Sequence, residues 1–292
     1  MFYFISKSDI ANYADDTTPF TINETVDSLL DSLENDTDTL IKWFKDNYLK
    51  LNANKCHLLI SNHRKDIHIN VEEEIIECEK SVKLLGVTID NQLNFNEHVS
   101  TIYKRASQKL QALARISNYM CQNKLRTLMK AFIESQFNYC PLIWMFHSRT
   151  LNNKINKLHE RALRLVYKNT NLTFIELLRK DNSFSIHHRN LQKLAIELYK
   201  VKNNLSPTLM KDIFPERFIP YNLRRINPFQ SSKVNTVYNG TETLSFRGPK
   251  TWELVPEDIK SAPTLEEFKA KIKNWEPSGC ECRLCKIYIY NI

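Results

Sequence analysis

The stretch Ile10-Ala11-Asn12-Tyr13-Ala14-Asp15-Asp16-Thr17-Thr18-Pro19-Phe20 lies near the start of a 292-residue chain. Short β-prone segments flank two adjacent carboxylates, a pattern that predicts a β-hairpin with Asp15 and Asp16 at or near its turn. Adjacent side chains of a regular strand point to opposite faces, but a turn can direct two carboxylates toward one ion. Mg²⁺ prefers such oxygen ligands. By pattern alone, an Asp-Asp pair in a turn is more often ordinary solvated turn chemistry.

The composition excludes several classes of protein. The chain has only four glycines, so it cannot build a Gly-rich phosphate loop or a dinucleotide fingerprint. No apolar run approaches the ~20 residues of a membrane span, and the first residues lack the basic start of a signal peptide. The cysteines outside the C-terminal tail are scattered, which fits a reducing compartment. We therefore expect an intracellular protein, nuclear or cytoplasmic, that is not secreted and has no membrane partner.

Charge is distributed very unevenly along the chain. Residues 1–40 hold nine acidic residues and one basic residue, whereas residues 101–170 hold 13 Lys and Arg against two Glu. A block of that sign can attract a polyanion by releasing its counterions, although it can also be the solvated surface of ordinary helices. The basic residues that we consider candidates for nucleic-acid binding are Lys104, Arg105, Lys109, Arg115, Lys124, Arg126, Lys130, Lys154, Lys157, Arg161 and Arg164.

Hydrophobic periodicity predicts an α+β fold in four parts. Residues 1–95 should hold the hairpin, a helix over 21–48 and short antiparallel strands, including one continuous strand over 83–90. Residues 96–205 should form a helical domain, and the proline-containing segment 206–230 should be a linker. Residues 231–292 should contain a hairpin around Asn239-Gly240, a helix and a cysteine-rich tail, which together make a small α/β unit.

Four stretches resemble reverse transcriptases of non-LTR retrotransposons, the LINE-like, jockey-type elements, and they occur in that family's order. Tyr13-Ala14-Asp15-Asp16 resembles the Tyr/Phe-Ala-Asp-Asp motif, and residues 49–56 resemble the segment that follows the palm helix. Residues 84–98 are similar to the primer-grip region, and residues 137–144 to a later signature. The resemblance implies the C-terminal part of the enzyme only: late palm, thumb and tail.

The resemblance also implies roles for individual residues. Asp15 would be a Mg²⁺ ligand with Asp16 as its partner, and Lys55 would lie near the incoming nucleotide. The basic helices of 101–170 would hold an RNA template and DNA primer, or an RNA–DNA hybrid duplex, by its backbone. The family's further metal-binding aspartate precedes this hairpin, and only Asp9 stands upstream here. We therefore expect that the isolated chain cannot extend a primer.

Two alternatives to a polymerase fragment follow from the same residues. The first is a non-catalytic basic module that binds nucleic acid through the thumb-like helices. The second is a transposon relic that does not fold stably, because a hairpin without neighbouring strands leaves a sheet edge open.

The tail carries Cys280, Cys282 and Cys285 in a Cys-x-Cys-x₂-Cys cluster. Thiolates at this spacing can bind zinc, but a structural zinc site normally has four protein ligands. The cluster supplies three and no Cys or His follows it, so zinc is not expected. His187-His188 has no acidic or cysteine partner at ligand spacing, so we expect a surface pair.

Overall fold

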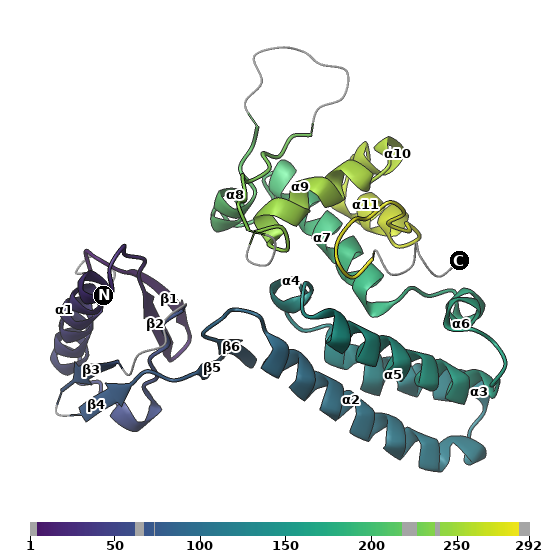
Figure 1. Ribbon diagram of the computed structural model, residues 1–292, viewed down its shortest axis with the longest axis horizontal. Coiled ribbons are helices and arrows are strands. Elements are labelled where there is room, and N and C mark those ends of the chain that lie inside the picture. The colour runs from purple at the N-terminus through teal and green to yellow at the C-terminus, as the bar shows by residue number, and fades with distance from the viewer. Residues whose placement is uncertain (1–4, 62–66, 73, 218–226, 237–239, 286–292) are drawn as a thin grey trace. The chain divides into compact units, whose positions relative to one another are not determined.

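The computed structural model describes residues 5–61, 67–72, 74–217, 227–236 and 240–285. The chain divides into two compact units, Met1–Leu93 and Asn94–Ile292. Small antiparallel sheets and one long helix make up the first unit, and helices dominate the second (Figure 1). The α+β class is therefore confirmed. No described helix combines the length and the apolar composition that a membrane span requires.

The first unit begins with the predicted hairpin. Strands β1 (Asp9–Tyr13) and β2 (Asp16–Phe20) pair antiparallel with Tyr13 opposite Asp16. The long helix α1 (Val26–Asp46) follows, and it is capped by Thr25, whose hydroxyl accepts a hydrogen bond from the Ser28 backbone N–H, so the helix begins later than the predicted residue 21. Its apolar stripe packs with strand β3 (His68–Val71) in the core of this unit.

Two further hairpins complete the unit. β3 pairs with β4 (Glu74–Glu77), and β5 (Ser81–Leu84) pairs with β6 (Val87–Asp90). The prediction of one continuous strand over 83–90 was wrong, because Leu85 and Gly86 form a tight turn with φ angles of 45° and 85°. Positive φ at both turn residues is the hairpin geometry that favours glycine at the second position.

The second unit opens with packed helices that were largely visible in the periodicity. Helix α2 (Asn96–Ile116) packs against α5 (Arg149–Tyr167), and α3 (Gln122–Leu128) also contacts α5 (Figure 1). The α-helical geometry does not continue after α3, which passes into the π-helical turn η4 (Met129–Ile133) and then the 3₁₀ turn η5 (Glu134–Phe137). Their shared core includes Ala106, Leu125, Met129, Ile155 and Leu163.

A second core in this unit surrounds helix α7. The remaining helices are α4 (Pro141–Trp144), α6 (Phe174–Asp181), α7 (Ile186–Lys202), α8 (Leu209–Ile213), α9 (Leu244–Leu254), α10 (Glu257–Lys260) and α11 (Leu265–Ile272). Helix α7 contacts both α9 and α11, and the Trp252 ring of α9 stacks on the Phe268 ring of α11.

Two expectations for this C-terminal region differ from the structure. The described ends of segment 206–230 are not a simple linker: Phe214 and Phe229 are buried, and Glu216 bridges to Phe229. The hairpin around Asn239-Gly240 was wrong in its second strand, because α9 begins at Leu244; Asn239 itself lies outside the described residues. Local β-propensity there is overridden by packing of the α9 face on Phe214 and Phe229.

Candidate nucleic-acid interface

The two aspartates of the first unit stand at the tip of the β1–β2 hairpin. Ala14 and Asp15 form its two-residue turn, and Asp16 is the first residue of β2. Both carboxylates are exposed. Ala14 has a φ of 54°, a left-handed conformation that alanine adopts at a cost and that the tight turn imposes. Because Asp15 lies in the turn and not in a strand, its side chain and that of Asp16 are not required to point to opposite faces of the hairpin.

No larger carboxylate cluster forms around this pair within the described ranges. There, no group of three acidic, His or Cys side chains that could hold a metal includes Asp15 or Asp16. Lys55 lies in the same unit, exposed, at the end of the 3₁₀ turn η2 (Ala53–Lys55). Carboxylate oxygens at a turn are suitable ligands for Mg²⁺, so the pair can contribute part of a magnesium site.

Helix α5 carries a stripe of cations along one side in the second unit. Lys154, Lys157, Arg161 and Arg164 follow one another at steps of three, four and three residues, so they lie on one helical face. The opposite face holds the buried residues Leu151, Ile155, Leu158, Ala162 and Val166. Because that apolar face is fixed in the core, the cationic face is presented to solvent.

Most of the other candidate cations are also exposed. Lys104, Arg105 and Arg115 on α2 and Lys124 on α3 have exposed side chains, and Lys109 is half-buried. None of these five forms an ion pair with an acidic side chain in the described part of the chain. Together with the α5 stripe, they give the helical layer, which consists of α2, α3 and α5, a strongly positive charge.

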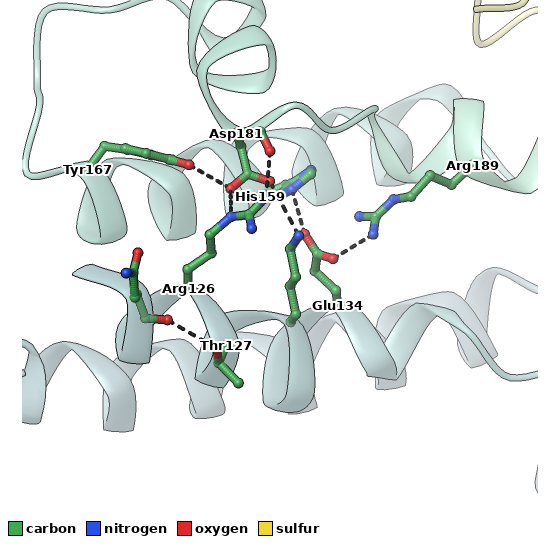
Figure 2. A network of polar contacts seen from close by, with 9 residues as sticks. Arg126, Thr127, Glu134, His159, Tyr167, Asp181 and Arg189 are labelled. Atoms are coloured by element: carbon green, nitrogen blue, oxygen red, sulfur yellow. Dashed lines mark hydrogen bonds and ion pairs between the residues drawn. The ribbon is translucent and has the colours of Figure 1, made fainter. Parts of the chain in front are cut away.

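Three of the eleven predicted cations are engaged inside the unit instead. Arg126 Nε lies 2.6 Å from a carboxylate oxygen of buried Asp181, and Lys130 Nζ lies 3.8 Å from the other oxygen (Figure 2). Arg164 pairs with Glu160 one turn earlier on α5. Burial alone would raise the pKa of Asp181, but hydrogen bonds from Arg126 and Tyr167 outweigh it and lower the pKa. Arg126 and Lys130 therefore hold helices together, a role the sequence did not indicate.

Glu134 is the centre of a neighbouring buried network. One of its oxygens lies 3.2 Å from His159 Nε2, and the other accepts a hydrogen bond from Arg189 Nη1 at 2.6 Å (Figure 2). Burial would raise the pKa of Glu134, yet the His159 hydrogen bond and the Arg189 charge lower it to about 2. The network links the η5 turn, α5 and α7, and so fixes the helix that presents the cationic stripe.

The expected surface pair His187-His188 was wrong for its first member. His187 is buried in the first turn of α7, and its Nε2 lies 3.1 Å from Cys282 Sγ. These two residues are separated by 95 positions. A search for ligands at local spacing therefore could not have joined them.

The two halves of the predicted polymerase site belong to different units. Asp15, Asp16 and Lys55 are in Met1–Leu93, whereas the cationic helices are in Asn94–Ile292. Each half is therefore described by its own geometry.

Comparison with known proteins identifies similar sequences of one kind. The chain is 26% identical over 167 residues to the probable RNA-directed DNA polymerase from transposon BS of Drosophila melanogaster. It is 25% identical over 165 residues to the RNA-directed DNA polymerase from mobile element jockey of the same organism. Each match covers just over half of this chain, 55% and 54%, but only 18% of the relative.

No protein-family model matches the chain, and no solved structure matches it significantly. The predicted resemblance to reverse transcriptases of non-LTR retrotransposons is nevertheless confirmed by these two matches. Over just over half of its length, the chain is similar to the RNA-directed DNA polymerases of two Drosophila non-LTR retrotransposons.

Proposed function

We propose that this chain is part of an RNA-directed DNA polymerase, with the first unit as the late palm and the second as the thumb and tail. Two kinds of observation support the proposal. The relatives are named as RNA-directed DNA polymerases, and a hairpin tipped by two carboxylates precedes a strongly basic helical unit. The substrate would be an RNA template paired with a DNA primer.

The α5 stripe is the observation that carries the binding part of the proposal. From Lys154 to Arg161, the members that pair with no acidic side chain in the described part of the chain, it extends about 10 Å at 1.5 Å per residue. One strand of a duplex presents a phosphate every ~3.4 Å along the axis, so these three cations face about three phosphates. Contacts of this kind fix the position of a duplex without reading its sequence, as a polymerase thumb requires.

The catalytic part of the proposal rests on the hairpin. Asp15 and Asp16 would hold Mg²⁺, which stabilises the charge on the attacking and leaving oxygens in nucleotidyl transfer. Lys55, with its positive ammonium group in the same unit, would neutralise charge on the incoming triphosphate. Two-metal chemistry needs more carboxylates than this pair, and the described residues place no third acid beside it. The chain alone should therefore bind a hybrid duplex without extending it.

Salt-dependent binding tests the stripe directly. A fluorescently labelled RNA–DNA hybrid is titrated with the full chain at several salt concentrations, and anisotropy gives the affinity. Replacing Lys154, Lys157 and Arg161 by Gln should lower the magnitude of the log–log salt slope by about 2.7, since each phosphate contact contributes about 0.9. The matched control replaces Lys269, Lys271 and Lys273 by Gln, which removes the same charge from α11 and the residue after it.

The control separates a docking stripe from a general charge effect. We expect the α11 variant to retain the slope of the unaltered chain. Equal losses in the two triple variants would show that net charge alone drives binding, and the stripe would have no special role.

Primer extension tests the catalytic part. With Mg²⁺ and deoxynucleotides, the isolated chain should leave an annealed primer unextended while still binding it. Incorporation that Asp15→Asn abolishes would contradict the expected inactivity and would make the hairpin a working centre. Binding without extension is also the result expected for the alternative function, a non-catalytic basic module. This alternative is favoured by the hydrophobic core that α2, α3 and α5 share among themselves.

A further inference from the structure

We propose that the second unit binds one structural zinc ion through Cys280, Cys282, Cys285 and His187. The sequence supplies three thiols in the tail, and the fold supplies the fourth ligand from the first turn of α7. A Cys₃His set is one of the standard compositions of structural zinc sites. The proposal is independent of polymerase function.

The distances fit such a site. His187 Nε2 lies 3.1 Å from Cys282 Sγ, and the ligand atoms of His187, Cys282 and Cys285 all lie within 4.8 Å of one another. Tetrahedral zinc with ordinary bond lengths places a nitrogen and a sulfur about 3.6 Å apart, and two sulfurs about 3.8 Å apart. The atoms are thus already grouped around a volume of the right size.

Cys280 adjoins these residues, because its sulfur accepts hydrogen bonds from the thiols of Cys282 and Cys285 and from the Cys282 backbone N–H. It is not among the three residues whose ligand atoms all lie within 4.8 Å of one another, so binding zinc would draw its sulfur closer to His187. The Cys285 backbone N–H donates to the Cys282 carbonyl at 3.1 Å, which closes the turn between these two cysteines. The turn therefore holds the sulfurs of Cys282 and Cys285 close to His187.

The four side chains are buried together, which separates this cluster from an accidental one. His187 is 3% exposed, and Cys280, Cys282 and Cys285 are 6%, 0% and 6% exposed. The His187 Nε2 atom that lies beside the Cys282 sulfur is the imidazole nitrogen that would coordinate the metal. Thiolate and imidazole ligands select zinc over the hard cations Mg²⁺ and Ca²⁺.

The ion would fasten the tail to the body of the unit. Residues 280–285 come from beyond α11, whereas His187 begins the central helix α7. Arg283, between Cys282 and Cys285, also donates a hydrogen bond to the Phe146 carbonyl, so the tail already contacts the body of the unit at this point. Because a metal bound only by the folded chain stabilises that state, zinc should make docking of the tail part of the folding of this unit.

Metal analysis of the full chain tests the proposal. The chain is purified in the presence of reductant, incubated with zinc and desalted. Its zinc content per chain is then measured by inductively coupled plasma mass spectrometry. We expect one zinc per chain, and cobalt in its place should give the absorption of thiolate-to-cobalt charge transfer. His187→Ala should lower zinc affinity by more than about a hundredfold, beyond the loss that removing an outer hydrogen-bond partner causes.

Matched variants keep the test decisive. His188→Ala and Cys121→Ser remove a neighbouring histidine and an exposed cysteine, and both should retain one zinc. His187→Cys keeps four ligands and should retain zinc even if His187→Ala fails to fold. The proposal is overturned if the reduced chain holds no zinc, if His187→Ala binds it as tightly as the unaltered chain, or if His187→Cys loses it.

Discussion

Replacing Glu134 by Gln should destabilise the second unit strongly without changing its shape. The substitution keeps the size of the side chain and one acceptor oxygen, but it removes the charge and turns an N–H group toward either Arg189 or His159. Glu134 is 5% exposed, so water cannot replace these partners. The loss therefore falls on the folded state alone.

The structure sets the size of the effect. The pKa of Glu134 falls from 4.5 to about 2, and each unit corresponds to 1.36 kcal/mol. The ionised form therefore contributes about 3 kcal/mol to the free energy of unfolding at neutral pH, within the roughly 3–5 kcal/mol lost when a buried ion pair is broken. Glutamine resembles the protonated acid, so Glu134→Gln should cost about that amount.

Urea unfolding followed by helical circular dichroism measures the difference, with Glu160→Gln as the matched control. Glu160 pairs with Arg164 in a partly exposed contact on α5, so its loss should cost no more than about 0.5 kcal/mol. Equal costs for the two variants would refute the reasoning.

The pH dependence gives a second check on the same carboxylate. Because its folded pKa lies below its unfolded value, the stabilisation is complete above about pH 4.5 and is lost as the pH falls toward 2. The gap between the unaltered chain and Glu134→Gln should close over that interval.

Two other substitutions test local geometry. Ala14→Gly should relieve the left-handed φ at the hairpin tip and stabilise it by roughly 0.5–1 kcal/mol, so amide exchange in β1 should slow about two- to fivefold; unchanged exchange would mean that the turn carries no strain. Gly248→Ala should cost about 1–3 kcal/mol in thermal or urea unfolding, because the added Cβ would lie 2.3 Å from the Phe214 ring; a neutral result would show that the ring moves aside freely.

Elements with a strong local signal were predictable from the sequence. The hairpin with Asp15 and Asp16 at or near its turn and the helical domain over 96–205 were predicted from alternation and from period 3.6, which record one buried face per element. Leu85-Gly86 was missed because its flanking residues alternate as a continuous strand would, so the turn is specified by two backbone angles rather than by pattern.

Contacts between distant residues account for the remaining differences. Arg126 was grouped with exposed cations, since nothing near it in sequence marks Asp181 as its partner. His187 has no ligand at local spacing because its partner Cys282 is 95 positions away and is brought near it by the tertiary fold. The composition correctly predicted that the helices within residues 101–170 carry a net positive charge. It could not predict which of their Lys and Arg side chains form ion pairs within the unit.

The π-helical turn at Met129–Ile133 makes the unit sensitive to the length of its chain. A π-turn accommodates one residue more than an α-helical turn, so residues after it are rotated by about 100° relative to an uninterrupted helix. Glu134 is the first residue after the π-turn, and with this rotation its carboxylate faces His159 and Arg189. Deleting one residue from this turn should therefore restore a regular α-helix and rotate the Glu134 carboxylate toward solvent. The structure of this segment thus depends on its number of residues as well as on their types.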